Sequence, residues 1–327
     1  MVERLVANEK VEGSTPFARS KIIVIKSKFI TKIFQNYLKN IDIRILKKNF
    51  FYYIIFRIIR NFLDKNIIIK IYNFKIYGSI KKNDTSYFLL KKCEFGDYHE
   101  IETITRISNH SKIFLLDCGC NYGFYSFHTA SIRDENQIVS VEASSKTSDA
   151  FLKNKELNKF ENISFHNKAI SDQDDLEINF HVSENDWESS LTHKNYRINQ
   201  VEKIKTCKID TLLGNYNLKD YILFFKLDIE GNEINAIKGG LKIIEKFSPI
   251  IIIEISKFIF DKTENINYLS NFLNKYQYQI YDTNKNLIEI NDILSKLNQL
   301  TKKNKTIGNY YLIKKNSKEL TLFKKND

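Results

Sequence analysis

The chain has 327 residues, of which 43% are apolar and 28% are charged. This composition can form a packed core and excludes a disordered chain, a collagen and a disulfide-dense scaffold. Its four cysteines have neither zinc-ligand spacing nor a C-x-x-C pair, which indicates a reducing, cytosolic setting. The net charge is +12, and residues 1–75, with 16 basic and 5 acidic residues, account for +11 of it.

The first 20 residues have no apolar segment of the kind that a signal peptide requires. They include Gly13-Ser14-Thr15-Pro16, a tetrapeptide that the T-arm of a transfer-RNA gene can encode. We therefore expect residues 1–20 to be a start-site artefact that is not part of the fold.

The basic segment over residues 21–65 contains the longest apolar run, residues 50–56. Polar residues follow at 57, 60, 61 and 64, which is the spacing of one stripe on a helix. The run is far shorter than the about 20 apolar residues of a membrane span. We expect this helix to pack on the rest of the chain, and the alternative is that it lies in an anionic membrane interface. The expected location is the cytoplasm, with peripheral contact at the inner face of the membrane under that alternative. The chain is also rich in Ile, Lys and Asn, whose codons are A/T-rich, and this bias is the simpler explanation of the lysines.

Two β-prone runs, over 67–77 and 85–91, flank Lys82-Asn83-Asp84 and predict a hairpin. Asp97 is expected to cap a helix that runs to about residue 107 and has Glu100 in its first turn. Residues 21–95 are therefore assigned to a basic N-terminal extension that ends in a hairpin.

From residue 96 onward, short apolar runs alternate with segments of helical periodicity. Strands that alternate with helices predict a parallel sheet with helices on both faces. Residues 173–210 are polar and are expected to form an insertion of strands and loops within a domain over 96–315. A polar tail is expected over 316–327. Strands are expected over 113–118, 137–141, 163–166, 223–228, 250–255, 278–281 and 310–313, and helices over 122–132, 147–158, 232–246 and 264–275.

The first of these strands runs into the pattern D-x-G-x-N-x-G, which begins at Asp117. Gly119 and Gly123 let the backbone turn sharply and approach a ligand closely. Open α/β sheets bind ligands at the carboxyl ends of their strands. The pattern differs from G-x-G-x-x-G, which disfavours an NAD enzyme. Asp117 also places negative charge where a pyrophosphate would lie, so a cationic ligand fits better.

Acidic residues close the next strands as well. Glu142 lies 25 residues after Asp117, at the position where a carboxylate accepts hydrogen bonds from ribose hydroxyls. The turn over 167–172, after the third strand, is placed to meet an adenine edge.

The fourth strand ends in Lys226, Asp228 and Glu230, which strand alternation would place on one side. Charged groups at a buried strand end are costly unless they are paired or used. Asp228 and Glu230 are therefore candidate functional residues, with a salt bridge as the alternative. Glu254 is a weaker member of the same rim.

Together these segments resemble the FkbM family of S-adenosylmethionine-dependent methyltransferases. The matching residues are Asp117, Gly119, Asn121, Gly123, Glu142, Ala143, Asn167, Ala169, Ile170, Ser171, Asp172, Asp228, Ile229, Glu230, Gly231, Glu233, Gly239, Pro249 and Glu254. Small Cys118 and Cys120 replace the more usual Val and Ala of the family.

The resemblance implies an α/β fold of the class I methyltransferase (Rossmann-like) type. This fold has a seven-stranded, mostly parallel sheet with helices on both faces and an antiparallel final strand, here over 310–313. The resemblance also implies S-adenosyl-L-methionine (SAM) as cofactor, with Asp117 at its methionine end and Glu142 at its ribose. The candidate cofactor-binding residues are Asp117, Gly119, Cys120, Asn121, Gly123, Glu142, Ala143, Asn167 and Ala169. Asp228 and Glu230 are the candidates for a catalytic base or for orienting the substrate, and no metal ligand is assigned.

The expected reaction is O-methylation of a hydroxyl on a sugar, a glycan or a secondary metabolite. One alternative is a catalytically silent SAM-binding or membrane-docked module in a glycan assembly complex. Another is a metal-assisted O-methyltransferase in which Asp228 and Glu254 hold Mg²⁺. Nucleic acid is not an expected partner, because the catalytic part is nearly neutral. Trp187, His181 and His193 lie in the insertion, where substrate contacts are expected.

Overall fold

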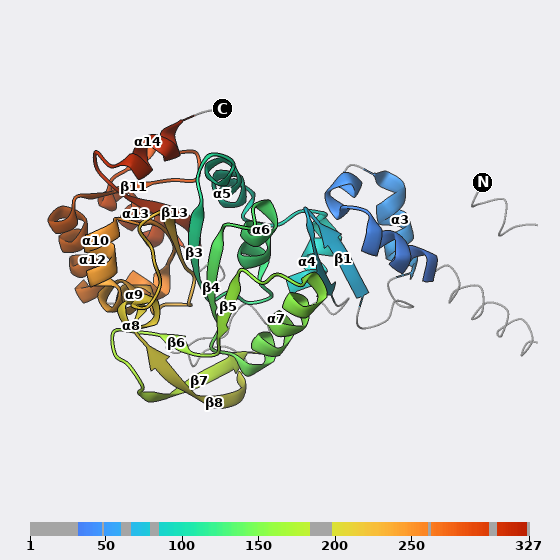
Figure 1. The fold of residues 1–327 in the computed structure, drawn as a ribbon, viewed down its shortest axis with the longest axis horizontal. Coiled ribbons are helices and arrows are strands. Elements are labelled where there is room, and N and C mark those ends of the chain that lie inside the picture. The colour runs from blue at the N-terminus through green and yellow to red at the C-terminus, as the bar shows by residue number, and fades with distance from the viewer. Residues whose placement is uncertain are drawn as a thin grey trace, which may run out of the picture.

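The computed structural model describes residues 32–47, 49–59, 67–78, 85–183, 198–260, 263–300 and 306–325. Its centre is a sheet with the strand order β12-β11-β13-β10-β9-β3-β4-β5. Helices cover both faces of this sheet (Figure 1). β13 runs antiparallel to β10, whereas β9 is parallel to both β10 and β3. Apart from β12, a two-residue strand at one edge, the sheet is the predicted seven-stranded sheet with an antiparallel last strand in the chain.

The strands of the central sheet are β3 Ile113–Cys118, β4 Gln137–Val141, β5 Ile163–His166, β9 Ile222–Leu227, β10 Ile250–Ser256, β11 Tyr278–Tyr281, β12 Leu287–Ile288 and β13 Thr306–Lys314. The helices around it are α5 Tyr98–His110, α6 Phe124–Ile132, α7 Ser145–Asn158, α8 Ile209–Leu213, α9 Glu233–Gly239, α10 Leu241–Phe247, α11 Lys257–Phe260, α12 Thr263–Tyr276, α13 Ile290–Asn298 and α14 Lys318–Lys324.

The predicted strands are confirmed, and the central ones are apolar runs that the sheet buries on both faces. Every residue of β3 and of β9 is buried, as expected for central parallel strands. The single helix predicted over 232–246 was wrong, because it divides into α9 and α10 at Gly240. At Gly239 the chain passes so close to the 171–172 turn that a Cβ atom would lie 2.1 Å from the Ser171 backbone oxygen.

The insertion contains strands, as predicted. β7 Glu177–Ser183 and β8 Ile198–Cys207 form an antiparallel pair, and β6 Ala169–Ile170 joins β8 in parallel. His181 lies in β7, whereas Trp187 and His193 lie outside the described residues. The expected artefact over 1–20 also lies outside them.

The predicted hairpin was wrong in its pairing. β1 Ile67–Ile71 pairs with β2 Phe74–Gly78, so both strands come from the run over 67–77. Tyr72, with a φ of 51°, begins the tight turn between them. Residues Thr85–Lys92 form the helix α4 instead of the second strand. A run of 11 β-prone residues is long enough for two short strands, and its turn lacks glycine and proline.

The hairpin packs against α6 and α7 through contacts of β2 with both helices. Asn158 of α7 accepts a hydrogen bond from the Lys75 backbone N–H at 2.7 Å and donates one to its carbonyl oxygen at 2.6 Å. Asn154 accepts another from the Tyr77 N–H at 2.7 Å. These amides satisfy backbone groups of β2 that its partner β1 leaves open. The extension is therefore fixed to the sheet.

The segment before the hairpin is fixed as well. It contains a helix over residues 32–40, the short helix η1 Ile43–Leu46 and α3 Phe50–Ile59. The Arg44 guanidinium lies 3.6 Å from the centre of the Tyr72 ring, which in turn lies 4.5 Å from the His128 ring of α6. The helix predicted after residue 50 is α3, and it packs on the chain with part of its surface, where the Tyr52 hydroxyl donates to the Leu90 carbonyl oxygen. The polar positions 60, 61 and 64 lie outside the described residues.

The polar tail expected over 316–327 was wrong, because it contains α14. Phe323 is fully buried, with ring centres 4.8 Å from Tyr311 and 5.5 Å from Tyr281. Arg106 of α5 donates hydrogen bonds to the carbonyl oxygens of Leu322 and Phe323 at the end of this helix. Leu320 and Leu322 pack against the same apolar cluster, so three apolar residues dock this short helix. None of the helices in the described part of the chain is both long and apolar enough to cross a membrane.

Candidate functional site

The loop after β3 turns the chain sharply into α6 at the carboxyl end of the sheet. Gly119 has a φ of +73°, and a Cβ atom here would lie 1.9 Å from the backbone oxygen of Asp228. Gly123 has a φ of +89°, and a Cβ atom would lie 2.3 Å from the Phe127 ring. Left-handed backbone and close packing thus both require glycine at these two positions. The glycines bring the loop against the end of β9.

Asp117, the last charged residue of β3, is buried with 1% of its surface exposed. Its Oδ2 accepts a hydrogen bond from Ser126 Oγ at 2.6 Å. Its Oδ1 has no partner among the described residues. Burial raises the pKa of Asp117, while the positive charge of Lys226 and the Ser126 hydrogen bond oppose that rise. A buried carboxylate oxygen without a partner is costly, so this atom is suited to a ligand that carries a positive charge or a donor group.

Glu142 follows β4 and joins two loops of the site. Its Oε2 accepts from the Asn121 N–H and its Oε1 from the Ser144 N–H, both at 2.9 Å. Burial raises the pKa of Glu142, and these backbone hydrogen bonds oppose the rise. Each carboxylate oxygen has a second lone pair, so Glu142 retains the capacity to accept from a diol. The structure therefore places Glu142 and the glycine loop in direct contact, as the order of the strands predicts.

Asn167 supports the loop that carries Glu142. Its amide nitrogen donates to the carbonyl oxygens of Glu142 at 2.8 Å and Ala143 at 3.2 Å, and to Ser148 Oγ at 3.0 Å. Ala169 is buried and packs in a small apolar cluster with Ala143. Asn167 and Ala169 thus lie beside the loop after β4.

Cys120 and Asn121 form the middle of the glycine loop. The Cys120 N–H donates to the Val141 carbonyl oxygen at 3.1 Å, and Asn121 has a φ of 48°. Burial raises the pKa of the Cys120 thiol well above its ordinary value. Since the thiolate is the reactive form of cysteine, the raised pKa disfavours this thiol as a nucleophile.

Lys226 is a buried cation at the end of β9. Its Nζ lies 3.0 Å from Asp228 Oδ2 and 3.5 Å from the Gly119 carbonyl oxygen. Burial lowers the pKa of Lys226, but the carboxylates of Asp228, Asp117 and Asp97 raise it more, so it lies above its ordinary value. The lysine therefore balances several carboxylates around the site.

Strand alternation predicted an extended backbone through residue 230. This prediction was wrong, because the chain turns directly after β9. Glu230 has a φ of 53° and Gly231 a φ of 102°, so residues 228–231 form a tight turn. The predicted residues still come together, because the turn folds Glu230 back toward the sheet. One carboxylate oxygen from each of Asp228, Glu230 and Glu254 lies within 4.8 Å of the others.

A family model described as the methyltransferase FkbM domain matches residues 117–280, half of the chain. This chain belongs to the FkbM methyltransferase family. The match begins at Asp117 and includes every site residue described above. The FkbM fold of this chain is the class I methyltransferase fold, with β12 added to the usual seven strands.

Solved structures similar to this FkbM chain include a methyltransferase FkbM from Methylobacillus flagellatus KT, with 18% identity over 70% of this chain and a TM-score of 0.38. The chain spans 52% of the length of that protein. M. jannaschii TYW2 in complex with AdoMet has 13% identity over 67% of this chain and 76% of its own, with a TM-score of 0.35. An rRNA methylase from Streptococcus thermophilus has 11% identity over 68% of this chain and 97% of its own, with a TM-score of 0.36. No curated protein matches the chain.

The sequence patterns did not assign Asp97 and Tyr125 to the FkbM site. Asp97 makes no capping hydrogen bond, and its Oδ2 instead accepts from the Tyr125 hydroxyl at 2.9 Å. Lys226 Nζ lies 5.0 Å from the centre of the Tyr125 ring. Burial raises the pKa of Asp97, with Lys226 opposing the rise. The position of Asp97 directly before α5 could have indicated its place in the site. A helix that runs antiparallel to the following strand β3 begins at the carboxyl end of the sheet.

The carboxylates of Asp228, Glu230 and Glu254 are close enough to hold a metal ion. One oxygen of Asp228 is already paired with the Lys226 ammonium at 3.0 Å. A fixed positive charge at that distance opposes the binding of a divalent cation. The donor set therefore fits an organic ligand better than Mg²⁺.

Glu233 of α9 holds the 228–231 turn. Its Oε1 accepts from the backbone N–H groups of Ile229 at 3.0 Å and Gly231 at 3.1 Å. Its Oε2 has no partner among the described residues. Burial raises the pKa of Glu233 from 4.5 to about 7, against the hydrogen bonds from the backbone.

We expect Glu233→Gln to remove a pH dependence of stability. Between pH 4.5 and about 7 the folded state holds this proton and the unfolded state does not, so the free energy of unfolding falls as the pH rises through that window. At roughly 1.4 kcal/mol per pKa unit, the fall amounts to a few kcal/mol. Urea unfolding of both proteins at pH 4 and pH 8 measures it. Relative to the parent, the free energy of unfolding of the variant should be higher at pH 8 than at pH 4. An equal difference from the parent at both pH values would contradict this assignment. Glu245→Gln, on exposed α10, is the matched control.

Proposed function

We propose that this FkbM methyltransferase uses SAM and transfers its methyl group to a hydroxyl of a sugar, a glycan or a secondary metabolite. One observation supports the proposal most. Asp117, with its unpartnered buried oxygen, and Glu142 lie at neighbouring strand ends on either side of a glycine loop. A carboxylate for a cationic group and a second one for a diol are what SAM requires.

The residues of the site fit SAM as follows. Asp117 Oδ1 is the acceptor available to the methionine end, and Gly119 and Gly123 keep the loop backbone free of side chains there. Glu142 accepts from the ribose hydroxyls while its backbone partners hold it in place. Asn167 and Ala143 support the loop that faces the adenine. The acidic surroundings favour a cationic sulfonium.

The carboxylates at the end of β9 act on the acceptor. When bound, SAM supplies an electrophilic methyl group on a sulfonium. The acceptor oxygen forms the new bond to carbon as the bond from carbon to sulfur breaks, and the hydroxyl proton passes to a base. Asp228 and Glu230 are the proposed groups for orienting this hydroxyl and for taking its proton. Lys226 restrains Asp228 through one oxygen and leaves the second for the acceptor.

Titration calorimetry of the full chain with SAM and with S-adenosylhomocysteine tests the proposed cofactor site. Hydrogen bonds to a charged group contribute about 1.5–3 kcal/mol. We therefore expect Glu142→Ala to raise the Kd for both ligands roughly 10- to 100-fold. Glu156→Ala, on the exposed side of α7, is the matched control and should leave Kd unchanged. Thermal melting checks that Glu142→Ala still folds. A parent chain that binds neither ligand would refute the proposal.

A second measurement separates an enzyme from a silent SAM-binding module. The chain is incubated with SAM labelled in its methyl group and with pools of glycans or hydroxylated metabolites. Label on an acceptor oxygen supports the enzyme. SAM binding without transfer to any pool would favour the silent module. Transfer that a chelator abolishes would favour the metal-assisted alternative, which the Lys226–Asp228 pair disfavours.

We also propose contact of residues 21–65 with a membrane.

A further inference from the structure

The N-terminal extension exposes apolar side chains in an unusual concentration. Of the twelve exposed large apolar residues among those described, six lie within residues 33–54. The other six are spread over the rest of the described chain. The exposed fraction reaches 71% for Phe50, 73% for Phe51 and 72% for Ile45. Single exposed apolar residues are normal on a protein surface, but a group of this kind marks an interaction site.

These side chains belong to elements that lie together. The helix over 32–40, η1 and α3 gather at one end of the molecule, beyond the β1–β2 hairpin (Figure 1). Ile33 and Tyr37 are one turn apart on the first helix, and Phe50 and Ile54 are one turn apart on α3. We call the six residues the exposed apolar face; they are Ile33, Tyr37, Ile45, Phe50, Phe51 and Ile54.

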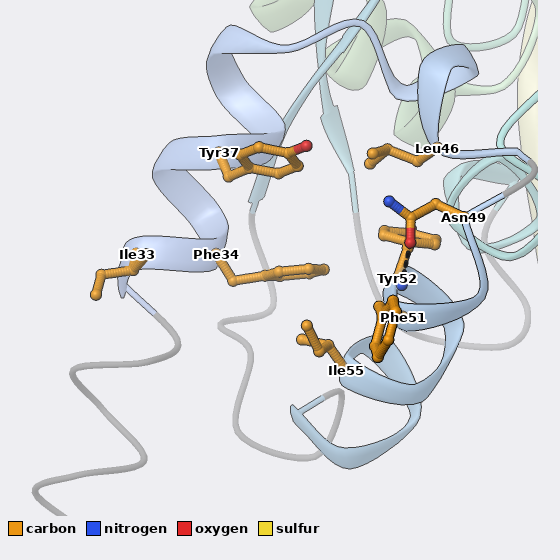
Figure 2. Close-up of a pocket in the computed structure, with 8 residues that line it drawn as sticks. All are labelled: Ile33, Phe34, Tyr37, Leu46, Asn49, Phe51, Tyr52 and Ile55. Atoms are coloured by element: carbon orange, nitrogen blue, oxygen red, sulfur yellow. Dashed lines mark hydrogen bonds between the residues drawn. The ribbon is translucent and has the colours of Figure 1, made fainter. Parts of the chain in front are cut away.

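An apolar groove opens between the helix over 32–40 and α3. It has a volume of about 280 Å³, and Figure 2 shows Ile33, Phe34 and Tyr37 on one side with Phe51, Tyr52 and Ile55 on the other. Asn49 is the polar residue in its lining, and its side-chain oxygen accepts from the Tyr52 N–H at 3.2 Å. The groove therefore offers apolar contact.

The side of α3 that carries Tyr52 and Phe56 packs on the rest of the chain. The Tyr52 hydroxyl donates to the Leu90 carbonyl oxygen of α4 at 2.7 Å, and the Tyr52 ring stacks on those of Phe34 and Phe56. Tyr52 and Phe56 are buried. The helix thus packs with one side and presents the other, so packing accounts for only part of its apolar residues.

The charge around the exposed apolar face is positive. Residues 32–59 contain six basic residues and one acidic residue. Lys32 and Lys39 are exposed on the first helix. Residues 21–31, just before that helix, add three lysines and no acidic residue. A second copy of this face would meet like charges, whereas an anionic surface would be complementary to it.

We propose that the exposed apolar face docks on an anionic lipid membrane, with its aromatic and aliphatic side chains at the acyl boundary and its lysines at the headgroups. Interfacial helices bind membranes through this combination of apolar area and positive charge. Since β2 is fixed to α7 by Asn154 and Asn158, docking would hold the whole chain in one orientation.

The test is flotation of the full chain with vesicles of phosphatidylcholine, alone or with 30% phosphatidylserine. We expect binding to the anionic vesicles that added salt weakens. Phe50→Ser/Phe51→Ser should weaken it at least about tenfold, because two side chains of the apolar contact are lost. Leu152→Ser/Leu287→Ser is the matched control, since it removes two exposed apolar side chains elsewhere and should bind as the parent does. Circular dichroism and SAM titration of the same samples verify the fold and keep this test separate from the test of the site.

Several results would overturn the proposal. The absence of anionic vesicle binding by the parent chain is one. Unchanged binding by Phe50→Ser/Phe51→Ser would place the membrane contact elsewhere, for instance in residues 21–31. Concentration-dependent dimerisation that the same variant abolishes, without vesicle binding, would assign the exposed apolar face to a second copy of the chain.

Discussion

Gly119→Ala should destabilise the fold by about 3 kcal/mol and abolish SAM binding. The left-handed backbone at a φ of +73° costs a residue with a Cβ atom about 1–2 kcal/mol. The new methyl group would also lie 1.9 Å from the backbone oxygen of Asp228. Forcing an extra carbon into a packed site typically costs about 1–3 kcal/mol more. Since the loop and the end of β9 must separate, both halves of the site move.

Gly308→Ala is a control that isolates the backbone contribution. Gly308 has a φ of +105°, and a Cβ atom there would meet nothing within 4 Å. Urea unfolding of both variants gives the free energies, and calorimetry gives the affinity for SAM. Gly119→Ala should lose clearly more stability than Gly308→Ala, and only the former should lose the ligand. Equal losses of stability would show that the contact with Asp228 does not constrain the loop.

The central strands of the sheet could be predicted from the sequence because their apolar runs are buried on both faces. Residues 113–118, 137–141, 163–166 and 278–281 form strands with the predicted bounds. The pattern over 67–77 was less informative, since β-prone residues do not reveal a two-residue turn that contains neither glycine nor proline. The run over 85–91 forms a helix, whose packing overrides its local preference for a strand.

The site could be predicted where it follows from strand order. Asp117 and Glu142 close neighbouring parallel strands, so their loops had to meet, and the hydrogen bond from Asn121 to Glu142 joins them. Asp97 could not be placed in this way. Its position before a helix indicated a cap, but its partner Tyr125 lies 28 residues later in the chain. A contact of that separation has no local signal.

The turn over 228–231 shows a second limit of sequence patterns. Alternation assumes an extended backbone, and nothing in the pattern marks the residue at which β9 ends. Glu230 takes a positive φ because Glu233 binds the N–H groups on both sides of it. The two carboxylates three residues apart thus have different tasks: Glu233 holds the turn, and Glu230 faces the rim.

Lys226→Met should destabilise the chain by about 3–5 kcal/mol at pH 8. The lysine is buried, and its removal leaves Asp228 and Asp117 without their positive partner. Breaking a buried ion pair from one side has a cost of that order, because an uncompensated charge stays behind. The loss should shrink as the pH falls, because burial raises the pKa of Asp117 and, without Lys226 to oppose that rise, its carboxylate takes up a proton in the folded state.

Two further variants decide whether this loss arises from the ion pair. Lys226→Met/Asp228→Asn removes both partners and should recover part of the stability, with a coupling energy of about 1–3 kcal/mol in a double-mutant cycle. Lys238→Met is the matched lysine, whose Nζ lies 5.0 Å from the centre of the Tyr268 ring at a half-buried position; its loss should be about 1 kcal/mol or less. Urea unfolding at pH 5 and pH 8 measures these variants together with Asp228→Asn, the single substitution that the cycle also requires. Additive effects of the two substitutions would mean that Lys226 stabilises the sheet by packing, and that its charge does not hold the carboxylates of the site in place.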